Sequence, residues 1–208
     1  VIHDPVTTTD ELIPSGETSS YRSNPIGLSE FALSRRVPEY VGRSKAVRAL
    51  EEAREAGDVP AEVKEVLAKV GGDAAHTTIG SCVFANKPGD GSAREQAASC
   101  QKVLGGFANV CYEYATKRYR SNCINWGIVP FTMDKALAFD YEDGDWLYIP
   151  GIRKAILDGQ EEFTAKVITK DGQVKELPLQ CKGLTADDKL IVTEGCLMNY
   201  YAAGYGKA

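Results

Sequence analysis

Residues 87–98, KPGDGSAREQAA, gather residue types that bind anions and transfer protons. Gly89 and Gly91 allow the backbone to approach a ligand closely. Ser92 carries a hydroxyl group, and Arg94 can make a two-pronged contact with a carboxylate. The alanine-rich sequence that follows favours a helix, and a helix N-terminus offers unpaired N–H groups and a partial positive charge. The segment therefore predicts a carboxylate site, and because it lacks the lysine of a P-loop, it excludes a nucleotide site of that kind.

A simpler interpretation of the same residues needs no ligand. Ser92-Ala93-Arg94-Glu95 fits the S-x-x-E pattern of a capping box. In that arrangement Ser92 accepts the backbone N–H of Glu95, and the Glu95 carboxylate reaches back to Ser92. The loop alone leaves both interpretations open.

Composition restricts the class of protein. The 208 residues are 43% hydrophobic and 25% charged, as in an ordinary globular domain, and the formal net charge is −5. An acidic chain argues against nucleic-acid binding, and the basic run KRYR at 117–120 is better explained as a solvated helix face. The sequence shows no membrane-spanning run and no signal peptide.

Cysteine spacing gives no metal motif. The closest two of the six cysteines, Cys100 and Cys111, are eleven positions apart, and no C-x-x-C is present. We therefore expect buried free thiols in a reducing compartment, that is, a cytoplasmic location. The cysteines are Cys82, Cys100, Cys111, Cys123, Cys181 and Cys196.

The elements that must position the loop alternate between strands and helices. Residues 1–40 are expected to be irregular, and the KDGQ turn at 170–173 predicts a hairpin. The expected helices are 44–56, 60–70, 93–104, a short one ending at 127, and 186–202. The expected strands are 76–85, 106–114, 128–133, 146–151 and the two arms of 163–181. This alternation indicates one mixed α/β domain over residues 1–208.

Four segments, taken in order, resemble the C-terminal swivel domain of the aconitase family. They are TTTDELIPSG (7–16), GDGSAREQAA with the later LGG (89–98 and 104–106), KRYRSNCINWGIVPF (117–131) and GDWLYIPGI (144–152). The first is similar to the family pattern T-T-D-H-I-S-x-x-G, and the second to G-x-G-S-S-R-E-H-A. The resemblance covers most of the chain and is weakest at 27–75 and in the last fifty residues.

The resemblance implies a fold, an activity and a partner. The fold is α/β, a swiveling β/β/α domain of the aconitase C-terminal (LeuD-like) type. The activity is that of a hydro-lyase acting on a hydroxy polycarboxylic acid. A [4Fe–4S] cluster, held by three cysteines of a separate larger portion on the same chain or another subunit, binds the substrate hydroxyl. We therefore expect this chain to be a fragment or subunit of a larger enzyme and to bind no cofactor itself.

The resemblance also implies roles for individual residues. The family's aspartate in the first segment falls on Asp10, and its substrate arginine, twelve positions later, falls on Arg22. The loop arginine falls on Arg94 and the first loop serine on Ser92. Arg22 and Arg94 are accordingly expected to face one cleft and to bind substrate carboxylates.

One departure from the family pattern bears on the chemistry. The second loop serine, which is the family's catalytic base, is replaced by Ala93, and Gln96 stands in place of the usual histidine. A methyl group accepts no proton, and loss of general-base catalysis costs about 100- to 10,000-fold in rate. Three outcomes stay open: Ser92 supplies the base, a different substrate needs none there, or the chain is a catalytically impaired polycarboxylate-binding or interaction domain.

Overall fold

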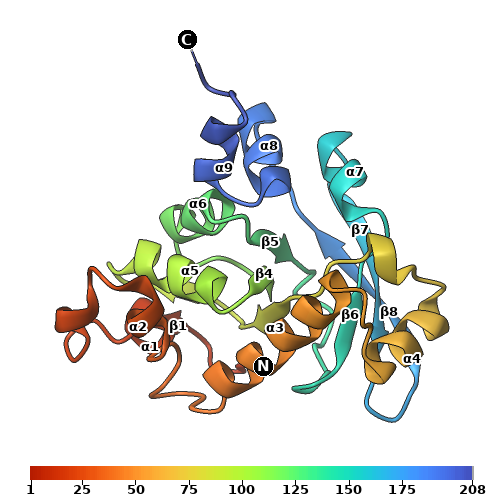
Figure 1. Ribbon diagram of the computed structural model, residues 1–208. Helices are drawn as coiled ribbons and strands as arrows, with labels where there is room; N and C mark the ends of the chain where they lie inside the picture. Colours follow the sequence, from red (N-terminus) through yellow and green to blue (C-terminus); the bar gives the residue numbers. More distant parts are fainter. Residues whose placement is uncertain (208) are drawn as a thin grey trace.

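The computed structural model describes residues 1–207 and is centred on a six-stranded mixed β-sheet (Figure 1). The strands lie in the order β2-β4-β5-β8-β7-β6. Their bounds are Ser81–Phe84 (β2), Gly106–Cys111 (β4), Val129–Thr132 (β5), Trp146–Tyr148 (β6), Glu162–Ile168 (β7) and Val174–Gln180 (β8). Each overlaps a strand expected from the sequence, and the prediction of a mixed α/β fold is confirmed.

Strands β2, β4 and β5 form the parallel half of the sheet. Parallel neighbours need a crossover connection. Helix α5 (Arg94–Val103) provides it between β2 and β4, and α6 (Lys117–Asn125) provides it between β4 and β5. The carboxyl ends of the three strands consequently share one edge of the sheet, and the loops that follow them lie at that edge.

The antiparallel half is built on the predicted hairpin. Strands β7 and β8 pair from Glu162 opposite Gln180 to Ile168 opposite Val174, so the hairpin is confirmed. Gly172 in its turn has a φ of +84°, a conformation that glycine adopts without strain. β8 joins the parallel half by pairing antiparallel to β5, where Thr132 lies opposite Gln180.

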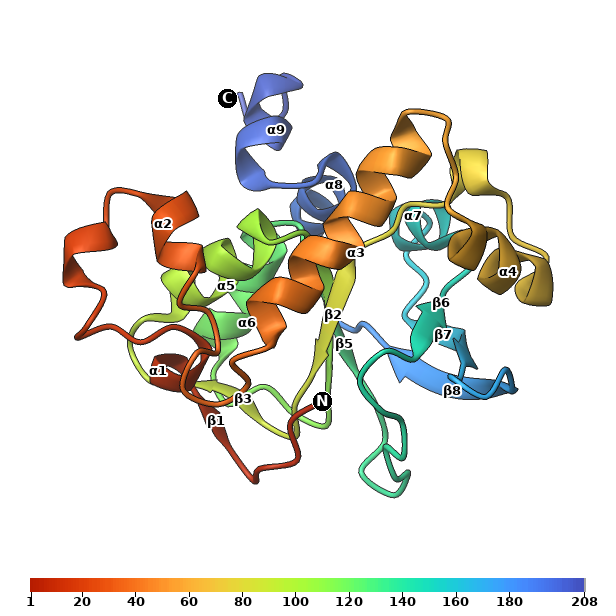
Figure 2. The same cartoon turned by 60° about the horizontal axis from the view of Figure 1, so that its bottom comes forward.

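Two helices of the middle segment agree with the sequence. They are α3 (Tyr40–Glu55), which crosses in front of β2 in Figure 2, and α4 (Ala61–Val70). Gly71, with a φ of +68°, ends α4 as the GG pair predicted. The apolar stripe of α4 is buried as expected, because Val63 and Leu67 pack with Ile79 in a small core cluster.

Short elements account for most errors in the sequence-based prediction. Residues 1–40 are not uniformly irregular, because short elements too brief to show periodicity occur there. They are β1 (Thr7–Thr8), α1 (Thr9–Leu12), a 3-10 turn η1 (Ser19–Tyr21) and α2 (Pro25–Ser29). Helix α7 (Ile152–Leu157) was not predicted either.

Two longer predictions also need correction. The strand expected at 76–85 begins only at Ser81. Its first expected residue, His76, belongs to a 3-10 turn η2 (Ala74–His76), which starts where Asp73 accepts the N–H of Ala75 at 3.0 Å. The helix expected at 186–202 is broken by Gly195, whose φ is +98°. The result is two helices, α8 (Ala186–Glu194) and α9 (Leu197–Ala202).

Four cysteines are buried free thiols, as expected, namely Cys100, Cys111, Cys123 and Cys181. Cys82 is exposed, which corrects the expectation for that residue, and Cys196 is partly exposed. The basic run 117–120 does not form a continuous charged surface. Tyr119 is buried, and Arg120 donates a hydrogen bond to the carbonyl of Lys182 at 2.5 Å.

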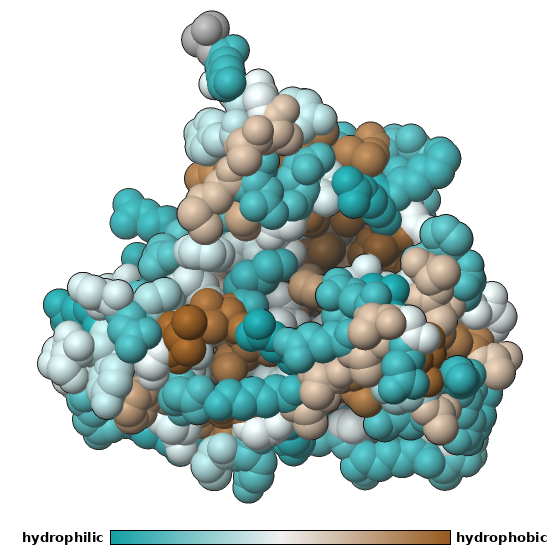
Figure 3. Space-filling model, viewed as in Figure 1, coloured by the Kyte–Doolittle hydropathy of each residue, from teal (hydrophilic) through white to brown (hydrophobic). Residues whose placement is uncertain are grey.

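Hydrophilic and apolar residues are interspersed over the face drawn in Figure 3, and apolar side chains gather in a hollow between the C-terminal helices and α7. Within residues 1–207, no helix combines the length and the hydropathy needed to cross a membrane.

Candidate functional site

The glycine-rich loop lies against the first of the four segments. Strand β3 (Pro88–Asp90) pairs in parallel with β1, with Thr7 opposite Pro88 and Thr8 opposite Asp90. Gly91 has a φ of +132°, and a Cβ added there would lie 2.1 Å from Thr9 Oγ1. Only glycine fits this close approach, so segments that are some 80 residues apart in sequence meet at the loop.

Helix α6, from the third segment, closes the other side of the loop. The Thr116 hydroxyl donates to the Gly89 carbonyl at 3.2 Å, and the Ala115 N–H donates to the Pro88 carbonyl at 2.9 Å. A Cβ added to Gly89 would lie 2.2 Å from the ring of Tyr119. Three of the four segments that carry the family resemblance therefore contact one another around residues 88–94.

The capping-box interpretation of the loop is wrong. The residue that caps α5 is Ala93, with φ −82° and ψ 44°, and it makes no side-chain cap. The Glu95 carboxylate accepts the indole N–H of Trp126 at 2.9 Å instead of reaching back to Ser92. Ser92 is exposed. The first N–H groups of α5 have no intrahelical partner, so this helix start is free of an internal side-chain cap and suits an anion.

Replacing Ala93 with serine should leave the fold intact or stabilise it. Ala93 is only partly buried and stands at an uncapped N-cap position. Serine is a favoured N-cap residue, and the gain for a well-formed cap is typically about 1 kcal/mol. Because the ψ of Ala93 departs from the extended value of most caps, we expect a change between zero and that value. Thermal melting of Ala93→Ser checks this, and a loss above about 1 kcal/mol would place the new hydroxyl in an apolar pocket.

The two arginines predicted to bind substrate are among the three arginines that have no partner in residues 1–207. Of the ten arginines in the sequence, seven make a hydrogen bond or ion pair to another residue within 1–207, namely Arg35, Arg36, Arg43, Arg48, Arg54, Arg120 and Arg153. The other three are Arg22, Arg94 and Arg118. Arg94 is the first residue of α5, and its Nε is buried with no hydrogen-bond partner among residues 1–207. A buried, unpaired guanidinium nitrogen is costly, so Arg94 lacks an acceptor that a carboxylate would supply.

The Asp10 carboxylate already has partners within the fold. Its carboxylate accepts the N–H of Ser15 at 3.0 Å and the hydroxyl of Ser15 at 3.2 Å, and it forms an ion pair with Arg35. The hydrogen bonds from Ser15, with the charge of Arg35, hold the pKa of Asp10 below its usual value. Asp10 therefore fixes the turn after α1, and its contact with a substrate stays a prediction.

Arg22 is exposed and follows the 3-10 turn η1. No hydrogen bond or ion pair within residues 1–207 joins it to Arg94 or to another side chain. The convergence of Arg22 and Arg94 on one cleft therefore stays a prediction.

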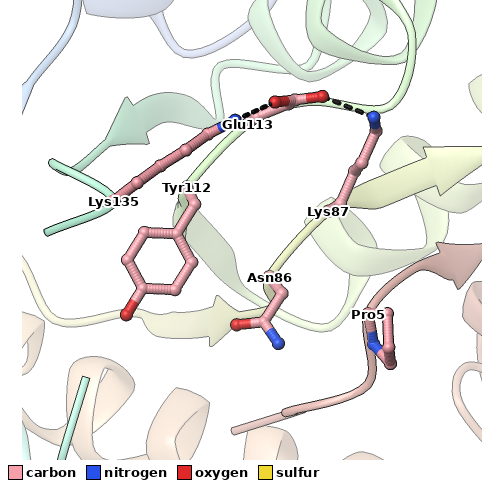
Figure 4. Close-up of a pocket in the computed structure, with 6 residues that line it drawn as sticks. All are labelled: Pro5, Asn86, Lys87, Tyr112, Glu113 and Lys135. Atoms are coloured by element: carbon pink, nitrogen blue, oxygen red, sulfur yellow. Dashed lines mark hydrogen bonds and ion pairs between the residues drawn. The ribbon is translucent and has the colours of Figure 1, made fainter. Parts of the chain in front are cut away.

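Next to the glycine-rich loop lies a group of charged residues for which the sequence predicted no role. Lys87, Glu113 and Lys135 line a cavity of about 370 Å³ together with Pro5, Asn86 and Tyr112 (Figure 4). Five of the six residues follow β2, β4 or β5. The signal that could have found them is their position just after three strands that form the parallel half of the sheet.

The residues of this chain do not fit an iron–sulfur cluster. Within residues 1–207, no three His, Cys, Asp or Glu side chains are grouped so that they could hold a metal ion. Four of the six cysteines are buried, and within the same residues they are not grouped with other possible ligands.

Similar proteins agree with the architecture. No protein-family model matches the sequence. Over 119 residues, 54% of this chain, the sequence is 26% identical to aconitate hydratase A of Bradyrhizobium diazoefficiens, and the chain covers only 12% of that protein. The solved structure of 3-isopropylmalate dehydratase from Methanocaldococcus jannaschii is similar with a TM-score of 0.56 and 20% identity, over 97% of this chain and 90% of that one. This chain thus has a mixed α/β fold, which it shares with the solved structure of 3-isopropylmalate dehydratase.

Proposed function

We propose that this chain is the substrate-closing domain of an aconitase-like hydro-lyase that acts on a hydroxy polycarboxylic acid. The observation that supports it best is the state of its arginines. Arg22 and Arg94, the two residues that the family resemblance assigns to substrate carboxylates, are among the three arginines without a partner in residues 1–207. The names of both similar proteins, a hydratase and a dehydratase, agree with this reaction class.

The residues of this chain would bind and orient the substrate. Arg94 offers a planar pair of donors to one carboxylate, and the uncapped first turn of α5 adds backbone N–H groups beside it. Arg22 would bind a second carboxylate once the domain closes. Such positioning lowers the barrier by holding the reacting groups in place.

The partner in this proposal is a cluster-bearing portion, on the same chain or on another subunit. The [4Fe–4S] cluster there would bind the substrate hydroxyl. The proposal holds for both arrangements, because one similar protein is a chain of about this length and the other is a much longer protein of which this chain covers 12%.

A second candidate function, binding without turnover, arises because the residue that would transfer the proton is missing. Ala93 stands where the family has its base and cannot take a proton. The neighbouring Ser92 is exposed, and its hydroxyl makes no hydrogen bond within residues 1–207, so it is available to act. If Ser92 does not act, the chain is a domain that binds polycarboxylates or a partner without completing the reaction.

Ala93→Ser in the assembled enzyme separates these two functions. Where only the base is missing, the serine should raise hydration of an unsaturated tricarboxylate toward the 100- to 10,000-fold that general-base catalysis typically contributes. Ser92→Ala is the matched control, since it should abolish turnover only if Ser92 is the base. Unchanged, absent turnover in a folded Ala93→Ser enzyme with its cluster would favour the binding domain.

The isolated chain should take up no iron–sulfur cluster and show no turnover. Its cysteines are separated, and no grouped ligand set occurs within residues 1–207. Anaerobic reconstitution with iron and sulfide, followed by iron analysis and absorption spectroscopy, checks this. A stoichiometric [4Fe–4S] spectrum from this chain would contradict it.

A further inference from the structure

The cavity lined by Lys87, Glu113 and Lys135 lies at the edge of the sheet where α/β proteins commonly bind ligands. It has a volume of about 370 Å³, and its walls come from the loops after β2, β4 and β5 and from Pro5 (Figure 4). In open parallel sheets, ligands bind outside the carboxyl ends of the strands. Neither Arg22 nor Arg94 lines it, so this cavity is separate from the residues of the proposed substrate site.

The charges in the cavity are arranged around one carboxylate. Lys87 Nζ contacts Glu113 Oε1, and Lys135 Nζ contacts Glu113 Oε2. Figure 4 shows the two lysines reaching this carboxylate from opposite sides. The spacing of the two ammonium groups therefore suits a single carboxylate, with one oxygen for each lysine.

The cavity carries a net positive charge, and its two lysines have N–H donors that no residue among 1–207 accepts. Two lysines against one glutamate leave a net charge of +1, in a chain whose net charge is −5. An ammonium group has three N–H donors, so each lysine keeps donors beyond the one given to Glu113. The side chains of Lys87 and Lys135 are 41% and 69% exposed, so these donors are open to solvent.

The polar side chains of Asn86 and Tyr112, which also line the cavity, already make hydrogen bonds within the protein. Asn86 Nδ2 donates to the carbonyls of His3 at 2.7 Å and Asp4 at 3.1 Å. The Tyr112 hydroxyl donates to the carbonyl of Leu137 at 2.7 Å. These bonds hold the walls in place, and the two lysines are left as the groups that can receive a ligand.

We propose that Lys87 and Lys135 form a carboxylate-binding site that Glu113 occupies in the free protein, and that a small dicarboxylate replaces Glu113 there. One carboxylate of the ligand takes the place of Glu113 between the two lysines. The rest of the molecule fits the cavity, and the displaced Glu113 turns to solvent. The site does not depend on the substrate-closing role proposed above.

Protonation does not release Glu113 near neutral pH. The hydrogen bonds from Lys135 and Lys87 lower the pKa of Glu113 to about 2, so the carboxylate stays ionised. A ligand must therefore compete with it, and binding to the unaltered chain should be weak. Removing the resident carboxylate should expose the site.

Calorimetric titration of the chain with succinate tests the proposal at constant ionic strength. Glu113→Gln should bind succinate about tenfold more tightly than the unaltered chain. The reason is that Lys87 and Lys135 no longer donate charge-assisted hydrogen bonds to a carboxylate of the protein itself. Adding Lys87→Met or Lys135→Met to Glu113→Gln should remove this gain. Lys64→Met, at an exposed lysine on α4, is the matched control and should not.

Three results would overturn the proposal. One is a folded Glu113→Gln chain with no gain in succinate affinity, which would make the three residues a surface ion-pair network only. Another is equal or tighter binding of inorganic phosphate, which would make the carboxylate class wrong. The third is loss of succinate binding on adding Arg94→Met, which would place the ligand at the glycine-rich loop and leave the proposed function standing.

Discussion

Replacing Arg94 with lysine should weaken polycarboxylate binding by the assembled enzyme by about 1.5–3 kcal/mol, the typical contribution of a charge-assisted hydrogen bond. Lysine keeps the positive charge but cannot make the planar, two-pronged contact of a guanidinium. Arg94 begins α5 and has no partner for its buried Nε among residues 1–207, so its donors are free for a ligand. Inhibition of the assembled enzyme by tricarballylate measures the effect.

The matched control for this substitution is Arg118→Lys. Arg118 is exposed on α6 and also has no hydrogen bond or ion pair within residues 1–207. The Arg118→Lys enzyme should bind tricarballylate as tightly as the unaltered enzyme does. Equal inhibition of the Arg94 and Arg118 variants, with melting temperatures unchanged, would remove Arg94 from the carboxylate site.

Replacing Gly91 with alanine should destabilise the fold strongly. A Cβ at this position would meet Thr9 Oγ1 at 2.1 Å, and the φ of +132° is strained for any other residue. A positive φ alone costs alanine about 1–2 kcal/mol, and forced overpacking adds about 1–3 kcal/mol. Denaturant unfolding of Gly91→Ala measures the sum.

Gly57→Ala isolates the contribution of the contact. Gly57 also has a positive φ, +84°, but a Cβ there meets nothing within 4 Å. Gly91→Ala should therefore lose more stability than Gly57→Ala. Adding Thr9→Ala should recover part of the loss, because it removes the atom that the new methyl group would meet. Equal losses at the two glycines would mean that the loop and the first segment are not in close contact.

Elements with several turns or alternations could be predicted from sequence. The stripe of Val63, Leu67 and Val70 predicted α4, and the KDGQ turn predicted the β7–β8 hairpin. Helix α1 could not be predicted, because four residues show no periodicity. The break at Gly195 was missed, because the residues on both sides of it favour a helix.

The roles assigned to Asp10, Arg22, Ser92, Ala93 and Arg94 stay predictions. The structure does bring the loop and the first segment together, through Gly91 and Thr9. Local pattern alone gave a capping box at Ser92, which is wrong because the helix begins one residue later, after Ala93. Lys87, Glu113 and Lys135 were missed, because only the pairing of three strands brings them together.

Turnover by the assembled enzyme tests the central claim most directly. The measurement is hydration of an unsaturated tricarboxylate by a cluster-loaded large portion, with and without this chain, followed by the loss of absorbance of the double bond. We predict turnover only when the chain is present, and a large loss with Arg94→Lys but not with Arg118→Lys. A large portion that turns over equally well without the chain, or a complete assembly that neither turns over nor binds any polycarboxylate, would contradict the assignment of this chain as a substrate-closing domain.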